Sequence, residues 1–207
     1  MPLTRRHLIA LPAALALAPA AFTPAARAQS ADPRMAERSM GPADAKVLVT
    51  EFFSLTCSHC ASFQRDTFPR VKSELIDTGR IRYAWVDFPL DQVALTAAAV
   101  ARSLPAERYE PFITALLLSQ DRWAFARTAN PVEELAKMAA LAGMPRPAFN
   151  AAVADDGLKR AILAVQEAAE KKHGVQSTPS FVINGKLIAG AISFDAFKKA
   201  VEAAAGA

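Results

Sequence analysis

The chain has two cysteines, Cys57 and Cys60, which are separated by two residues in the stretch TCSHC. A pair at this spacing is a reactive redox pair, half of a metal site or a purely structural disulfide. The structural disulfide is disfavoured because a chain of 207 residues can bury a hydrophobic core large enough to stay folded without one. A loop this short would also restrict the unfolded chain very little.

A metal site requires more ligands than the sequence offers. The three histidines are His7, His59 and His173. A closed zinc site needs four ligands, and His59 cannot easily turn toward an ion held by the two cysteines that flank it. His173 precedes Gly174 and is better explained as a basic residue at the C-terminus of a helix. We therefore expect neither a metal nor a cofactor.

Thiol-disulfide exchange accounts best for the pair. It needs a thiolate, a second thiol that resolves the mixed disulfide, and a groove for the partner chain. Free N–H groups at a helix N-terminus, together with the helix dipole, stabilise negative charge on Cys57. Cys60, one turn later, is expected to be more buried. We therefore predict Cys57 as the exposed nucleophile and Cys60 as the resolving thiol.

Three further residues are expected to tune the thiolate: Ser58, His59 and Glu51. A partly charged His59 ring, or a ring N–H aimed at sulfur, would lower the pKa of Cys57. Glu51 lies six residues before Cys57, inside an apolar segment. It is either a buried proton acceptor for Cys60 or a structural acid, and the sequence leaves both readings open.

The elements around the pair indicate an α/β fold. The stretch KVLVTEFFSL is apolar almost throughout and predicts a buried central strand. A helix is expected from residue 58 to about 77, with a kink at Pro69. RIRYAWVDFPL predicts a second strand. Strand, helix and strand over residues 46–90 are typical of a parallel βαβ unit.

The rest of the chain divides into a helical block and a returning strand pair. Residues 91–173 consist of Ala- and Leu-rich segments separated by Pro, Gly and Asn, which predicts an inserted helical subdomain. In residues 174–207, Asn184-Gly185 predicts a hairpin turn. A final helix follows, capped by Ser193 or Asp195.

The N-terminal residues are typical of an export signal. Residues 1–28 contain Arg5-Arg6, an apolar run and a small-residue end at Ala26-Arg27-Ala28, and the Sec and twin-arginine routes both remain open. Residues 29–45 are expected to be a linker. Loss of the signal lowers the net charge from +4 to about +1, so no nucleic-acid partner is expected. The apolar run is too short for stable membrane insertion, and a periplasmic location would allow the cysteines to be oxidised.

Three stretches, EFFSLTCSHCASF, DFPLD and TPSFVINGK, resemble the DsbA family of thiol-disulfide oxidoreductases from about residue 46 onward. The resemblance implies a thioredoxin fold with an inserted helical subdomain. It also implies that Thr178-Pro179 is a cis peptide beside the cysteines, which presents backbone groups to an extended substrate. The chain departs from the family at Ser177, where Gly is usual, and at Gln64, where an acid is frequent.

The resemblance implies a function as well. We expect an exported oxidase that donates its Cys57–Cys60 disulfide to unfolded or partly folded exported proteins with cysteines. A quinone-linked membrane partner of the DsbB type would then reoxidise it. One alternative is a disulfide isomerase or reductase of the DsbC or DsbG type, which Thr178 weakly favours. Another is a non-catalytic peptide-binding chaperone module.

Overall fold

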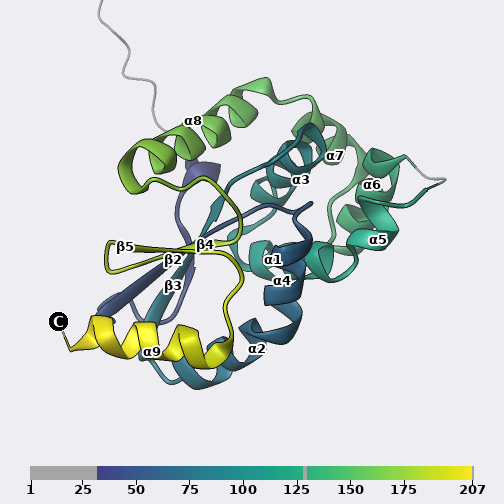
Figure 1. Cartoon of the computed structure of the whole chain (residues 1–207). Coiled ribbons are helices and arrows are strands. Elements are labelled where there is room, and N and C mark those ends of the chain that lie inside the picture. Colours follow the sequence, from purple (N-terminus) through teal and green to yellow (C-terminus); the bar gives the residue numbers. More distant parts are fainter. Residues whose placement is uncertain (1–31, 128–129, 207) are drawn as a thin grey trace, which may run out of the picture. The chain divides into compact units, whose positions relative to one another are not determined.

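A five-stranded mixed sheet organises the part of the chain that this computed structural model describes, residues 32–127 and 130–206 (Figure 1). The strand order is β1-β3-β2-β4-β5. Strands β2 and β3 pair in parallel, and the other neighbours pair antiparallel. The strands are β1 (Arg38–Met40), β2 (Val47–Phe53), β3 (Ile81–Asp87), β4 (Ser180–Ile183) and β5 (Lys186–Ala189).

Strand β2 lies at the centre of the sheet, as its apolar sequence predicts. Successive side chains of a strand point to opposite faces, so Glu51 and Phe52 lie on different sides. Phe52 packs with Phe88 and Val175 in a cluster that includes Ala169 of α8 (Asp156–His173). Glu51 lies on the opposite face of the sheet, which is the face toward the helix that carries the cysteines.

That helix is α1 (Ser58–Asp66), which is shorter than expected. Helix α1 ends at Thr67, and α2 (Phe68–Val71) and a π-helical turn (Lys72–Ile76) follow. Pro69 lies in the first turn of α2, where a proline displaces no helical hydrogen bond. The expected kink at Pro69 is therefore a break between two helices just before it.

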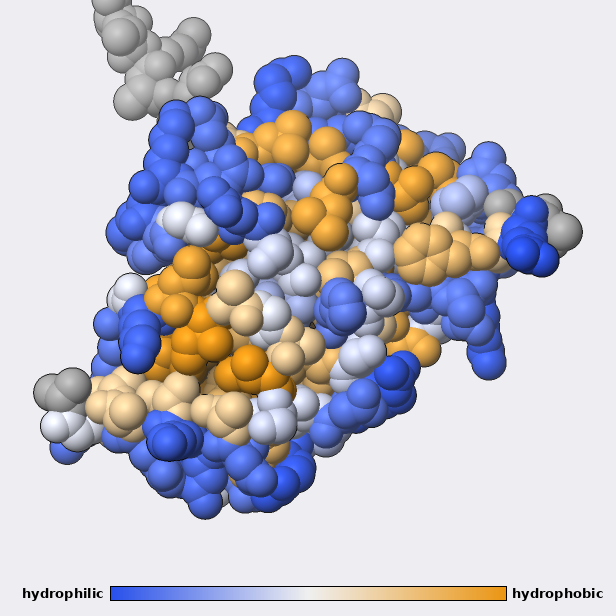
Figure 2. Space-filling model, in the orientation of Figure 1, coloured by the Kyte–Doolittle hydropathy of each residue, from blue (hydrophilic) through white to orange (hydrophobic). Residues whose placement is uncertain are grey.

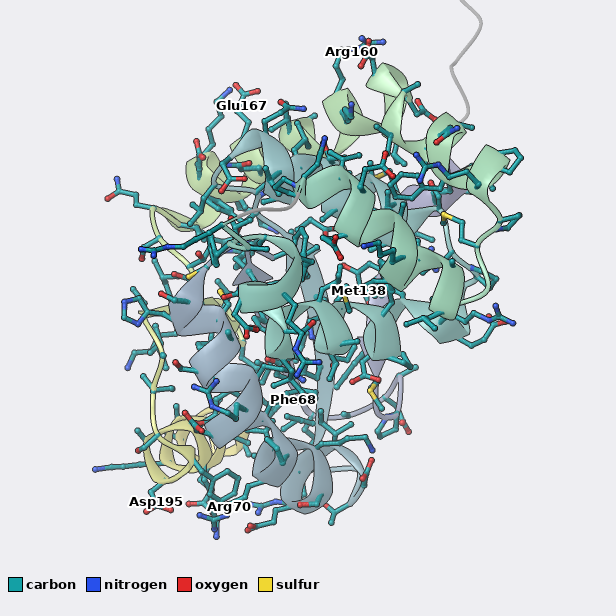
Figure 3. All side chains as sticks on the ribbon, turned by 90° about the vertical axis from the view of Figure 1, so that its right-hand side faces the viewer. Phe68, Arg70, Met138, Arg160, Glu167 and Asp195 are labelled. Carbon is teal, nitrogen blue, oxygen red and sulfur yellow. The ribbon has the colours of Figure 1, made fainter. Side chains whose placement is uncertain are left out.

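The C-terminal helix α9 (Phe194–Ala205) lies on the same side as α2. The Arg70 guanidinium stacks over the Phe194 ring at 3.9 Å and lies 3.9 Å from the Asp195 carboxylate. Figure 3 shows Arg70 and Asp195 together at one end of the molecule, with Arg160 and Glu167 of α8 at the other. Ser193 caps α9 through the N–H of Ala196, which identifies the capping residue among the two expected.

Between β3 and β4, the described residues form helices joined by turns and loops and contain no strand. Besides α8, these helices are α3 (Gln92–Arg102), α4 (Ala106–Leu118), α5 (Gln120–Trp123), α6 (Pro131–Leu141) and α7 (Arg146–Val153). Helix α3 packs against α4, α6, α7 and α8, while α4 packs against α1. The helical block and the sheet belong to one compact unit.

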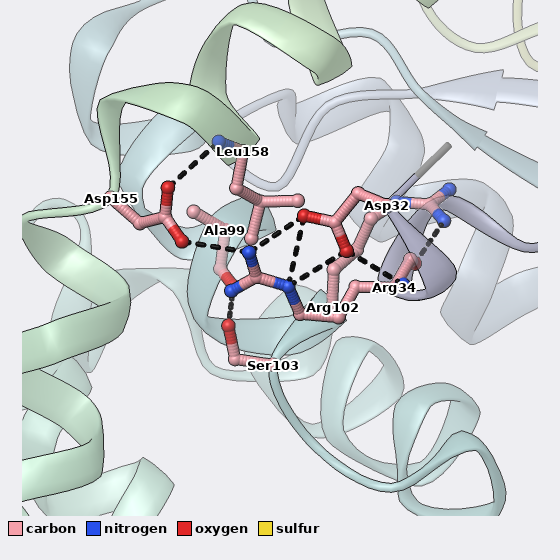
Figure 4. Close-up of polar contacts among 7 residues, drawn as sticks. All are labelled: Asp32, Arg34, Ala99, Arg102, Ser103, Asp155 and Leu158. Carbon is pink, nitrogen blue, oxygen red and sulfur yellow. Dashed lines mark hydrogen bonds and ion pairs between the residues drawn. The ribbon is translucent and has the colours of Figure 1, made fainter. Parts of the chain in front are cut away.

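The described part of the expected linker, residues 32–45, contributes a strand to the sheet. It contains a short 3-10 helix (Pro33–Met35) and strand β1, which pairs with the edge of β3. Arg34 bonds to Asp32 and to Asp155 of the helical block, and Arg102 donates to the backbone carbonyl of Arg34 (Figure 4). A three-residue strand has too little hydrophobic pattern to be visible in the sequence, and long-range contacts hold it in place.

The hairpin prediction is confirmed, because β4 and β5 are joined at Asn184 and Gly185, which have φ angles of 43° and 88°. Two positive φ angles are typical of a type I′ turn.

Hydrophobic surface gathers over strands β4 and β5, between α8 and α9 (Figure 2). No helix in residues 32–127 and 130–206 is long and apolar enough to cross a membrane. The predicted export signal, residues 1–28, lies outside the described residues.

Candidate functional site

The two cysteines lie at the start of α1 in unlike surroundings, both as free thiols. Cys57 is the N-cap of the helix, so the N–H groups of the first turn are directed toward its side chain. Cys57 is 8% exposed, whereas Cys60 is completely buried. Cys60 is therefore the more buried of the two, as predicted, but Cys57 is itself buried and not exposed as expected, because Thr178 and the cis proline lie against it.

Hydrogen bonds lower the pKa of the Cys57 thiol to about 5. The Cys60 thiol has the largest effect, and Thr178 and the backbone N–H groups of Cys60 and His59 add to it, while burial opposes them. The pKa of Cys60 moves the other way, well above its usual range. Burial is the main cause, followed by the Cys57 thiol and the charge of Glu51. At neutral pH, Cys57 is therefore a thiolate and Cys60 a thiol.

His59 and Ser58 are both exposed at the beginning of α1. The contribution of His59 to the Cys57 thiolate comes from its backbone N–H. No hydrogen bond joins the Ser58 side chain to another described residue. A tuning role for the Ser58 side chain or the His59 ring stays a prediction.

Thr178 and Pro179 lie against the cysteines although they are far away in the sequence. Their peptide bond is cis. In its protonated form, the Cys57 thiol donates to the Thr178 carbonyl oxygen at 3.3 Å. The Thr178 side chain also lowers the pKa of Cys57 by hydrogen bonding, and its buried hydroxyl has no other partner among the described residues. The expected arrangement of a cis proline beside the pair is thus present.

Glu51 is buried beneath the pair, on the face of β2 that is directed toward α1. Burial raises the pKa of its carboxyl group to about 7, against a hydrogen bond from Tyr83 that lowers it. The Tyr83 hydroxyl donates to Glu51 Oε2 at 2.8 Å, and both side chains are at most 2% exposed. Tyr83 was missed by the sequence analysis, since a tyrosine in an apolar strand gives no signal for this contact.

Two other polar residues near the pair were also missed or left without a role. Gln120 of α5 donates from Nε2 to the carbonyl oxygens of Leu55 and Cys57, at 2.9 and 3.0 Å. Gln64, which stands where an acid is frequent in the family, donates to Thr114 Oγ1 at 2.9 Å. Both link the cysteine region to the helical block. No cluster of three or more His, Cys, Asp or Glu side chains suited to a metal occurs among the described residues.

A strand order of 1-3-2-4-5, a CxxC pair at the start of the first long helix and a cis Thr-Pro against it define the thioredoxin-like class of proteins. A family model described as thioredoxin matches residues 34–203. The chain therefore belongs to the thioredoxin family and, by its structural relatives, to the DsbA proteins within it.

Among the solved structures, Wolbachia pipientis alpha-DsbA1 is 29% identical, with a TM-score of 0.76 over 83% of this chain and 92% of that one. Oxidised BdbD from Bacillus subtilis is 20% identical, with a TM-score of 0.69 over 83% of this chain and 94% of that one, and supports the fold alone. A protein of Rickettsia prowazekii that is provisionally named a protein-disulfide oxidoreductase is 31% identical over 80% of this chain. The chain spans 60% of the length of that curated relative.

Proposed function

We propose that the chain is an exported thiol-disulfide oxidoreductase of the DsbA type, which donates its Cys57–Cys60 disulfide to exported proteins with cysteines. The observation that supports this best is the opposite environment of the two sulfurs. A thiolate on Cys57 is stabilised, with a pKa lowered to about 5, while Cys60 is held as a buried thiol. A stabilised thiolate favours the reduced protein, and this makes the disulfide form oxidising.

The reaction begins with the disulfide form. A client thiolate attacks the Cys57 sulfur, the Cys57–Cys60 bond breaks, and Cys60 leaves as a thiolate and takes up a proton. A second client thiolate then attacks the client sulfur of the mixed disulfide, and Cys57 leaves as a thiolate. Two electrons pass from the client to the protein, and the client gains one disulfide.

Glu51 is proposed to exchange that proton with Cys60. Its pKa of about 7 makes both protonation states accessible near neutral pH, as proton transfer requires. The structural reading left open by the sequence has less support, because the charge of the buried Glu51 raises the pKa of Cys60 and so couples the two groups.

Thr178 and Pro179 are proposed to bind the client. An extended chain that pairs with the backbone near Thr178 would bring its own cysteine beside Cys57. Reoxidation is assigned to a quinone-linked membrane partner of the DsbB type, and export to the periplasm to residues 1–28. A disulfide is useful as a reagent only where an oxidising compartment restores it.

Purified protein in the disulfide form should oxidise a reduced dithiol peptide stoichiometrically, and Cys57→Ser should abolish this. Thiol trapping in living cells should find the pair mainly oxidised. A pair kept mainly reduced would instead favour an isomerase or reductase, and client binding that survives Cys57→Ser with no oxidation would favour a chaperone module.

Intact-mass measurement of exported protein should give a chain that starts near Gln29, and retention of residues 1–28 would contradict the export proposal.

A further inference from the structure

The Gln120 side chain connects the helical block to the backbone that carries Cys57. Its Nε2 group donates to the Leu55 carbonyl at 2.9 Å and to the Cys57 carbonyl at 3.0 Å, in buried surroundings. The Cys57 carbonyl also accepts the N–H of Ala61 at 3.1 Å. An amide NH₂ group has two protons and a carbonyl has two lone pairs, so all three bonds are made together.

Gln120 is itself held firmly. It is 7% exposed and opens helix α5, where its carbonyl accepts the N–H groups of Ala124 and Phe125 at 2.9 and 3.0 Å. Trp123 of the same turn is buried, and its indole N–H donates to the Leu116 carbonyl of α4 at 2.8 Å. Helix α5 therefore holds the Gln120 side-chain amide in place against the carbonyls of Leu55 and Cys57.

The position of the Cys57 carbonyl bears directly on the Cys57 sulfur. This carbonyl belongs to the peptide group between Cys57 and Ser58, so holding it fixes the ψ angle of Cys57, which is 117°. The next peptide groups along the chain carry the N–H groups of His59 and Cys60. These N–H groups are among the donors that lower the pKa of Cys57.

We propose that Gln120 is a positioning residue for disulfide exchange, which holds the Cys57 carbonyl so that the first turn of α1 directs its N–H groups at the reactive sulfur. The inference rests on the proposed function and deepens it. By this contact the helical block sets the reactivity of Cys57 without touching its sulfur.

The test compares Gln120→Met with Gln64→Met in the otherwise unchanged protein. Methionine keeps the length of glutamine and removes its donors. Gln64 is the matched control because it is also buried and also bonds to the helical block, at Thr114 Oγ1, but it does not contact the carbonyls before the helix. The readouts are thiolate absorbance against pH and the equilibrium of the disulfide with glutathione.

Gln120→Met should lower the ionisation constant of Cys57 about threefold, a rise of about half a pKa unit, and should make the disulfide less oxidising by a similar factor. Gln64→Met should move neither quantity, although both substitutions lower the free energy of unfolding. Gln120→Leu should repeat the result if Gln120→Met does not fold. Loss of stability without a change in either readout, or an equal change in Gln64→Met, would overturn the inference. A wild-type protein that fails to oxidise a dithiol peptide would reject the proposed function, whatever the variants do.

Discussion

The Cys57 sulfur lies 3.3 Å from the carbonyl oxygen of Thr178, a residue 121 positions further along the chain. The contact joins the start of α1 to the segment that re-enters the sheet after the whole helical block. It places the backbone next to a cis proline against the sulfur that is proposed to react. An extended client bound beside Thr178 would meet Cys57 first, because Cys60 is fully buried.

Cys60→Ser should trap clients on Cys57. In the variant, the Cys57 thiolate attacks a client disulfide, one client sulfur leaves as a thiolate, and the mixed disulfide remains because the protein has no second thiol to resolve it. Covalent adducts should therefore accumulate in exported material and separate on non-reducing gels. The matched Cys57→Ser variant should give none, since Cys60 is buried and its pKa is raised. Adducts that require Cys60 and survive loss of Cys57 would reverse the two roles.

The reduction potential of the pair should change its pH dependence near pH 5. Above the Cys57 pKa of about 5, reduction takes up one proton for two electrons, because only Cys60 is protonated. Below that pKa it takes up two. The slope should change from about 30 mV per pH unit above the break to about 60 mV below it. Equilibration with a reference dithiol between pH 4 and 8 measures this, and one steep slope across the range would mean that Cys57 is an ordinary thiol.

His59→Leu separates the ring of His59 from its backbone N–H. Loss of the ring should raise the pKa of Cys57 by about one unit. The backbone donors remain in this variant and should keep that pKa below the usual range of a thiol. The disulfide should become less oxidising by about 30 mV, equivalent to about 1.4 kcal/mol. Thiolate absorbance and glutathione equilibria report the two changes independently.

His173→Leu is the control for His59→Leu, because His173 ends α8 and has no contact with the cysteines among the described residues. It should leave both quantities at wild-type values. If His59→Leu does the same, the ring has no part in stabilising the thiolate, and the Cys60 thiol, Thr178 and the backbone N–H groups account for it.

Glu51→Gln should remove a pH dependence of stability. Burial raises the folded-state pKa of Glu51 to about 7 from an ordinary value of 4.5, so the folded protein binds the extra proton between these pH values. The free energy of unfolding therefore falls as pH rises through that window, and the loss is complete above pH 7. Glutamine still accepts from Tyr83 and carries no charge. At pH 8 the oxidised variant should be more stable than the oxidised wild type by about 3 kcal/mol.

Denaturant unfolding of the oxidised form at pH 4 and pH 8 tests the Glu51 prediction. The two proteins should differ little at pH 4, where Glu51 is protonated in both the folded and the unfolded state. A wild-type stability that does not fall between the two pH values would show that Glu51 titrates normally, and its assignment as the proton partner of Cys60 would lose its support.

Local features of this protein can be predicted from the sequence because they depend on near neighbours. The helix start at Cys57, the buried central strand and the Asn184-Gly185 turn each depend on a few adjacent residues and a short periodicity. The same holds for the different burial of Cys57 and Cys60, since one helical turn separates a cap from an interior position.

The tertiary structure decided which distant groups surround the cysteines. Strand β1, within the expected linker, is held by the edge of β3 and by contacts of Arg34 and Arg102, none of which has a pattern in its own segment. Tyr83 reaches Glu51 from a neighbouring strand, and Gln120 reaches the Cys57 carbonyl across 63 positions of the chain. A tyrosine or a glutamine in an apolar segment gives the same sequence signal whether its side chain bonds to a near neighbour or to the loop that carries the cysteines. Only the packing of helices on the sheet determines which partner it meets, because a buried donor takes the acceptor that the fold brings within reach.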